Sequence, residues 1–150
     1  MKKQMAMAIL GVSITATLLP AQARNVKYMV SIPNTLESEQ VKAKLDGSVK
    51  LFFGPQAYAN DSRTIASMNA HGKMSIEFKA DIASCQASFA DALGTLQNNA
   101  KAAGADAVVN IVSYFKNGPV MSSATEFECR AGSNFSHVML KGELVKLSGK

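Results

Sequence analysis

The chain has 150 residues, of which 47% are hydrophobic, and its 16 Lys and Arg outnumber its 11 Asp and Glu to give a net charge of +5. This length suits one domain preceded by a short targeting segment. The basic residues are few and scattered, so composition does not support a nucleic-acid-binding protein.

Residues 1–23 predict a signal peptide. Lys2 and Lys3 precede an uncharged apolar run at residues 5–19, and Ala21-Gln22-Ala23 predicts cleavage between Ala23 and Arg24. The run is shorter than the ~20 residues of a membrane span, so we expect a periplasmic or secreted protein with no membrane contact after cleavage. A retained helical anchor is the alternative.

Cleavage would leave residues 24–150 as a single domain. Loss of Lys2 and Lys3 lowers the basic count from 16 to 14 against 11 acidic residues, and the net charge from +5 to +3. We interpret this charge as a matter of solubility.

The first half of this domain shows short strands and one short helix. Alternating apolar residues predict a strand over residues 24–32, which Pro33-Asn34 ends. A short helix is expected over 38–45 and a strand over 49–53, followed by a loop over 56–63. Residues 64–68 and 73–78 then predict a hairpin around a turn at 69–72.

The strongest pattern is a helix over residues 81–103. Asp81 is expected to cap its start, and Gly104 to end it in a left-handed conformation. Gln97 is expected on the outer face. The apolar stripe recurs every three or four residues and consists of Ile82, Cys85, Phe89, Leu93, Leu96, Ala100 and Ala103.

Strands dominate the rest of the chain. Residues 108–115 have high strand propensity, and Asn117-Gly118 predicts a hairpin turn to a second strand. In that strand Phe127 and Cys129 share one face, with Glu126 and Glu128 on the other. A last strand is expected over 137–147. The predicted fold is therefore α+β, with one long helix packed on a mainly antiparallel sheet that ends in a C-terminal hairpin and a final strand.

Cys85 and Cys129 predict one disulfide, because an exported protein meets an oxidising environment. The bond would join the helix to the sheet and close a loop of about 43 residues, which stabilises the fold by ~3–4 kcal/mol in the chain-entropy model. Free thiols are an alternative. A metal or redox site is less favoured, because the two residues lack close spacing and further ligands.

No pattern in the sequence predicts a catalytic, cofactor-binding or metal-ligating residue. Phosphate-binding glycine loops, nucleophile motifs and zinc-protease motifs are absent. His71 is interpreted as a solvated turn residue, and His137 as an isolated residue on the outer face of the last strand. Glu126 and Glu128 are interpreted as a solvated face or as partners of cross-strand lysines. The methionines after the signal peptide are interpreted as core filler: Met29, Met68, Met74, Met121 and Met139.

Three stretches carry a resemblance to known proteins: residues 102–111 (AAGADAVVNI), 125–132 (TEFECRAG) and 140–147 (LKGELVKL). They resemble small exported bacterial proteins that are labelled excinuclease ATPase subunits. That label conflicts with the residues, because such an ATPase carries P-loops and zinc cysteines that are absent here. The order of elements is more distantly similar to a heavy-metal-binding family and to the Rcs stress-sensor lipoprotein domain. These resemblances imply an α+β fold and carry over no catalytic residue.

The sequence thus favours an exported, non-enzymatic domain that acts through protein contacts, with a protein partner or a second copy bound at a sheet edge. Envelope homeostasis is suggested only by analogy of fold. The alternative is an enzyme or a small-ligand- or metal-binding protein, which a cleft gathering Glu126, Glu128, Tyr114 or His137 would favour. A role in DNA excision repair is opposed by the signal peptide and the missing P-loop.

Overall fold

The computed structural model describes residues 23–77 and 80–148, in which six strands form one sheet. In chain order the elements are β1 (Val26–Ser31), α1 (Ile32–Leu36), α2 (Glu39–Lys44), β2 (Lys50–Phe53), β3 (Arg63–Ser75), α3 (Asp81–Ala102), β4 (Ala107–Ser113), β5 (Glu126–Ala131) and β6 (Phe135–Lys146). β6 is the central strand. β3 pairs with one edge of β6 along the whole length of β6, so β5 and β4 share the other edge of β6. β1 lies antiparallel beyond β5, and β2 lies parallel beyond β4. The α+β prediction is confirmed.

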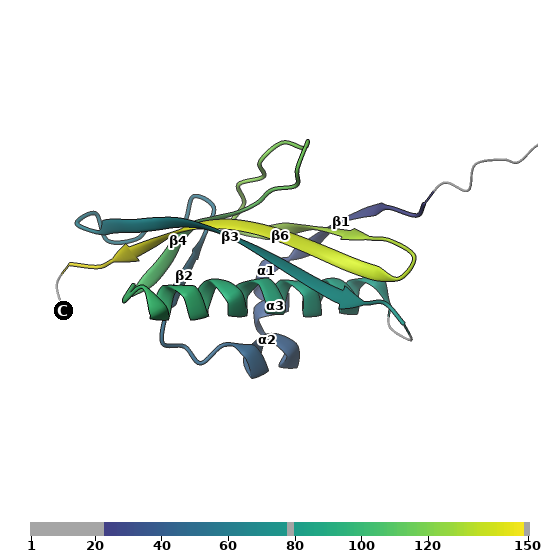
Figure 1. The fold of residues 1–150 in the computed structure, drawn as a ribbon, viewed down its shortest axis with the longest axis horizontal. Coiled ribbons are helices and arrows are strands. Elements are labelled where there is room, and N and C mark those ends of the chain that lie inside the picture. Colours follow the sequence, from purple (N-terminus) through teal and green to yellow (C-terminus); the bar gives the residue numbers. More distant parts are fainter. Residues whose placement is uncertain (1–22, 78–79, 149–150) are drawn as a thin grey trace, which may run out of the picture.

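The helices lie on one face of the sheet. Figure 1 shows α3 running along that face, α2 on the far side of α3, and the green loop between β4 and β5 rising from the opposite face. We call these the helix face and the outer face. This arrangement leaves the outer face without a covering helix among the described residues.

The helix-face core forms where α3 meets the sheet. Phe89 stacks on Phe127 of β5 with ring centroids 3.9 Å apart, and Phe53 of β2 lies 5.9 Å from Phe89. Most of the predicted stripe is buried, but Ile82 is 43% exposed, and Ala103, which follows the last residue of α3, is exposed as well. Ile82 lies in the first turn of α3. Since α2 contacts α3 three turns further on, near Gly94, nothing from α2 covers Ile82.

Gln97 is buried, so its predicted place on the outer face of the helix is wrong. Its Oε1 accepts a hydrogen bond from the Asp46 backbone N–H at 2.9 Å, and its Nε2 donates to the Lys44 carbonyl at 3.4 Å. α3 is thus covered on two sides, and Gln97 satisfies backbone groups at the end of α2.

Asp81 does not cap α3 as predicted. The N-cap residue is Ala80, and the Asp81 carboxylate instead binds Arg24 and accepts a 2.6 Å hydrogen bond from the Tyr28 hydroxyl. These bonds lower the pKa of Asp81, the bond from Arg24 most and that from Tyr28 next. Asp81 therefore connects the start of α3 to the start of β1. The other end of α3 agrees with prediction, since Gly104 has a φ of 69°.

The hairpin predicted around residues 69–72 is wrong, because β3 is one continuous strand. Asn69, Ala70 and His71 pair in register with Lys141, Leu140 and Met139 of β6. Gly72 is needed for close packing, not for a turn: a Cβ placed there would lie 1.7 Å from the Ser88 carbonyl oxygen of α3. Part of the predicted second strand, at residue 78, lies outside the described residues.

A turn forms beside the predicted one, but its central residues are Lys116 and Asn117 rather than Asn117 and Gly118, and it does not join two paired strands as predicted. Asn117 has a φ of 68°, and the Gly118 N–H donates to the Phe115 carbonyl at 2.8 Å. Beyond it, a single bridge between Ser113 and Met121 replaces the expected ladder. The reason is that β4 and β5 lie one after the other along the same edge of β6, where β4 pairs with residues 140–145 and β5 with residues 136–137. The C-terminal hairpin is instead β5–β6, where Arg130 faces His137.

Pro33 begins a helix after β1, where the sequence predicts only a break. It lies in the first turn of α1, where its missing N–H costs no hydrogen bond, and Ser31 caps that helix by accepting from the Asn34 N–H at 3.3 Å. The predicted strands at 24–32, 49–53 and 137–147 and the helix at 38–45 all form, with bounds shifted by one or two residues.

Cys85 of α3 and Cys129 of β5 form the predicted disulfide, with Cα atoms 5.8 Å apart. Such a bond is compatible with an oxidising, extracytoplasmic compartment. The predicted signal peptide lies outside the described residues except for Ala23, which precedes the predicted cleavage point. No helix in the described part of the chain is long and apolar enough to span a membrane.

Candidate functional site

The outer face holds a pocket of about 490 Å³, which we call the histidine pocket. β3, β5 and β6 supply its side chains from outward positions of the sheet, the segment before β1 closes one side, and the loop after β4 supplies an aromatic ring. Its lining residues are Arg24, Asn25, His71, Phe115, Arg130, Gly132, His137 and Met139.

The two histidines meet in this pocket. Nε2 of His71 and Nδ1 of His137 lie 3.0 Å apart, a hydrogen-bond distance at which one neutral ring donates and the other accepts. Burial lowers the pKa of His137 first, and the nearby charges of His71 and Lys73 lower it further. The neutral form of His137 is therefore favoured, and the two rings are joined by a hydrogen bond. The predictions that His71 lies in a turn and that the two histidines are isolated are wrong.

Arg130 is held in one orientation beside the pair. Its Nε donates to Oε1 of Glu128 at 2.9 Å, and its guanidinium carbon lies 4.6 Å from the centre of the Phe115 ring. Its two terminal nitrogens make no hydrogen bond to the described residues. Because the ion pair and the ring fix the plane of the guanidinium, these two donors are available to a ligand in a set direction.

Glu128 is buried at 3% exposure, so its predicted place on a solvated face is wrong. Its carboxylate is paired with Nζ of Lys27 at 3.3 Å as well as with Arg130, which confirms the alternative of cross-strand pairing with a lysine. Glu126 is exposed. Neither Glu126, Glu128 nor Tyr114 lines the histidine pocket, so His137 alone of the four predicted residues lies there.

No group of three or more His, Cys, Asp or Glu could hold a metal ion in the part of the chain that the structure describes.

Met29 is 40% exposed and Met139 lines the histidine pocket, so these two methionines are not core filler as predicted.

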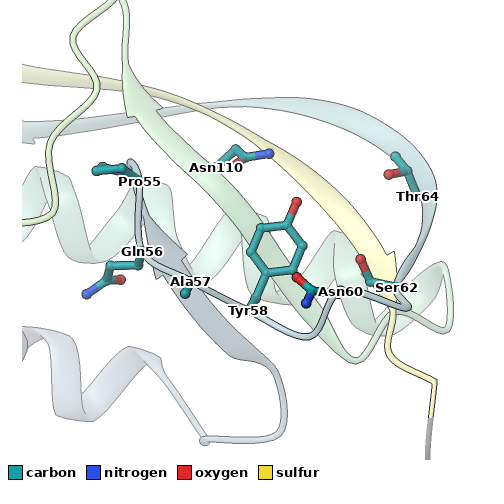
Figure 2. Close-up of a pocket in the computed structure, with 8 residues that line it drawn as sticks. All are labelled: Pro55, Gln56, Ala57, Tyr58, Asn60, Ser62, Thr64 and Asn110. Carbon is teal, nitrogen blue, oxygen red and sulfur yellow. The ribbon is translucent and has the colours of Figure 1, made fainter.

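A second hollow, of about 520 Å³, is lined by β4 and by the loop after β2. In Figure 2 the loop after β2 curves beside β4, so that Tyr58 and Asn60 from the loop and Asn110 from the strand line one space. Asn110 has a φ of 52° at a register shift of β4, and its Nδ2 donates to Oε2 of Glu143 at 3.3 Å. The lining contains no charged side chain: Pro55, Gln56, Ala57, Tyr58, Asn60, Ser62, Thr64 and Asn110.

The free edge of β3 is a third candidate, because this 13-residue strand pairs with β6 alone among the described residues. The Ile76 N–H donates to Asn134 on the β6 side, so even-numbered residues face β6 and odd-numbered ones face the free edge. α3 covers one end of that edge: Asp91 accepts from the Lys73 N–H at 3.4 Å, and Oγ of Ser84 donates to the Ser75 carbonyl at 3.4 Å. The open part is therefore residues 67–71.

The sequence contained one signal for the histidine pocket that the predicted hairpin concealed. Once β3 is read as one strand, His71 alternates with Ala70 and Gly72, which are buried, and it must point away from α3 like His137. Comparison with protein-family models, with curated proteins and with solved structures found no match for this chain.

Proposed function

We propose that the protein is an exported, non-enzymatic domain that acts through protein contacts, and that the open edge of β3 pairs with the same edge of a second copy. The open edge at residues 67–71 is the observation that carries the proposal. The signal-peptide pattern at residues 1–23 and the Cys85–Cys129 disulfide support export.

An exposed strand edge is a template for another strand, and soluble proteins usually block it. Here α3 blocks only the end near Lys73 and Ser75. The open part has no proline, so the backbone groups of its odd-numbered residues can all join a ladder. Ser67, Asn69 and His71 are exposed and have their backbone groups toward the edge.

Symmetric pairing suits the charges of this strand. In an antiparallel pair centred on Asn69, Lys73 of one copy lies opposite Ile65 of the other, and His71 lies opposite Ser67. Like charges do not face each other, which removes the usual penalty of self-pairing. The two sheets would then form one continuous sheet with both α3 helices on the same face.

The test is the oligomeric state of the exported protein, measured by sedimentation across a range of concentrations. Asn69→Lys places two ammonium groups together at the two-fold axis, and we expect it to weaken the dimer by roughly five-fold or more. Asn98→Lys, on the exposed side of α3, is the matched control and should leave the dimer unchanged. A monomeric wild-type protein, or equal effects of the two variants, would refute the pairing.

A further inference from the structure

The charges lining the histidine pocket favour a negative ligand. Two guanidiniums and two imidazoles contribute to the lining, and no carboxylate does. The nearest carboxylates are already paired, Asp81 with Arg24 and Glu128 with Lys27 and Arg130. Lys73, whose Nζ lies 4.0 Å from the centre of the Phe135 ring, adds positive charge beside His137.

The donors have the geometry that a carboxylate requires. The terminal nitrogens of Arg130 can donate two parallel hydrogen bonds to two oxygens of one group. Glu128 and Phe115 already fix the guanidinium, so binding loses little side-chain freedom. Arg130 is paired directly with His137 in the β5–β6 ladder, so the imidazoles of His137 and His71 can supply a further donor to the same group.

The remaining lining is apolar. Phe115 and Met139 belong to the lining, and the volume of about 490 Å³ lies within the range of small-molecule sites, roughly 300–1,000 Å³. A fully polar anion would leave these two side chains without a partner. A ligand with both a charged end and an apolar body satisfies the whole lining.

We infer that the histidine pocket binds a small organic carboxylate, whose charged group is held by Arg130 and the His71–His137 pair and whose apolar body contacts Phe115 and Met139. This site lies on the outer face and goes beyond the proposed pairing of β3 edges. It makes the protein a binding module for a small acid as well as a protein-contact domain.

Binding at this site is coupled to protonation of the pair. In the empty pocket, burial and the positive charges of His71 and Lys73 lower the pKa of His137; Arg24 and Arg130 face the same space. A bound carboxylate favours the imidazolium and raises the pKa, so binding takes up a proton. Affinity therefore rises as pH falls through the region near 6.5, the ordinary value for histidine.

Acidification strengthens ligand binding but lowers the stability of the protein without ligand. Because the folded pKa of His137 is lowered, the unfolded chain binds more protons below pH ~6.5. The contribution of neutral His137 to stability is complete at a pH above the pKa of the unfolded chain. It is lost as the pH falls from there toward the lower pKa of the folded protein. We therefore expect acidification to destabilise the protein without ligand. We also expect benzoate to stabilise it most at low pH.

The experiment is calorimetric titration of the purified protein with sodium benzoate at pH 5.5, 6.5 and 7.5, with acetate, inorganic phosphate and neutral benzyl alcohol as comparison probes. We expect benzoate to bind most tightly, and its dissociation constant to fall about ten-fold from pH 7.5 to 5.5. Saturable binding of phosphate as tight as benzoate, equal binding of benzyl alcohol, or no benzoate binding at any pH would overturn the assignment.

Three variants locate the site. Arg130→Lys keeps a cation beside Glu128 but removes the paired donors, and should weaken benzoate about ten-fold. His137→Gln removes the group whose protonation is coupled to binding, so it should abolish most of the pH dependence. Arg63→Gln, at the far end of β3, is the matched control and should bind as the wild type does; equal losses in Arg63→Gln and Arg130→Lys would refute the site. Asn69→Lys should still bind benzoate, so a failure of edge pairing and a failure of this site give different results.

Discussion

At the scale of single residues, the closest packing lies where α3 crosses β3 and β6. Ser84 and Ser88 of α3 each place Oγ 2.6 Å from Oγ of Ser136 in β6, so small polar side chains fill this contact and satisfy one another. Gly72 completes it, because the Ser88 carbonyl occupies the space of a side chain. Ser84, Ser88 and Ser136 are small like Gly72, which lets the helix approach the sheet closely here.

Gly72→Ala should therefore destabilise the fold by about 3 kcal/mol or more, since a helix backbone would have to move away from the sheet. Urea unfolding monitored by circular dichroism measures the change. Gly94→Ala is the matched control: Lys44 Cδ, 3.8 Å away, is the nearest atom to its new methyl group, and a helical alanine should be neutral or stabilise by ~0.5–1 kcal/mol. Similar losses in both variants would contradict the packing argument.

At the scale of elements, α3 is attached to the sheet at several points that are distant in sequence. The disulfide joins its second turn to β5, Asp81 joins its first turn to β1 through Tyr28, and Gln97 joins its last turns to the end of α2. These contacts fix the direction of α3 across the sheet, and with it the helix face and the outer face.

Replacing both cysteines, as Cys85→Ala with Cys129→Ala, should lower the free energy of unfolding by about 3–4 kcal/mol, because the open chain regains the freedom of a long loop. The separation of 44 residues sets this size. Reductant should destabilise the wild type by a similar amount and leave the double variant unchanged. A reductant effect on the variant, or none on the wild type, would show that the bond does not act in this way.

At the scale of the whole molecule, one face of the sheet carries all the described helices and the other is available for binding (Figure 1). The outer face nevertheless has a small apolar cluster of its own, in which Ala107, Val109 and Val145 are buried against Phe52, Tyr58 and Leu147. The loop after β2 covers this part, and the loop after β4 reaches toward the histidine pocket.

Export predicts a defined covalent form of the molecule. The intact mass of the protein purified from its producing cells without reductant should begin at Arg24, and it should be lighter by the two hydrogens that the disulfide removes. Native mass spectrometry checks both features in one spectrum. A full-length chain with free thiols would refute export, and removal of the signal peptide without the bond would refute only the disulfide in the exported form.

The sequence by itself determined the features that depend on local periodicity. Apolar residues that recur every three or four positions located α3, and the alternation of apolar and polar residues located β1 and β6. Two cysteines on predicted buried faces indicated their bond. All of these predictions agree with the structure. Such patterns report which side of an element is apolar, and that information is present in adjacent residues.

The tertiary structure decided which elements are neighbours, and the candidate sites depend on that. Gly72 is a residue type common in turns, yet it lies in the middle of a strand because α3 packs against it. Gln97 is polar, yet it is buried because α2 covers it. Glu128 alternates outward, yet it is buried between Lys27 and Arg130. His71 and His137 are 66 residues apart in the chain. They meet because β3 pairs with β6 along its whole length, and pairing over such a separation leaves no pattern in the residues beside either histidine.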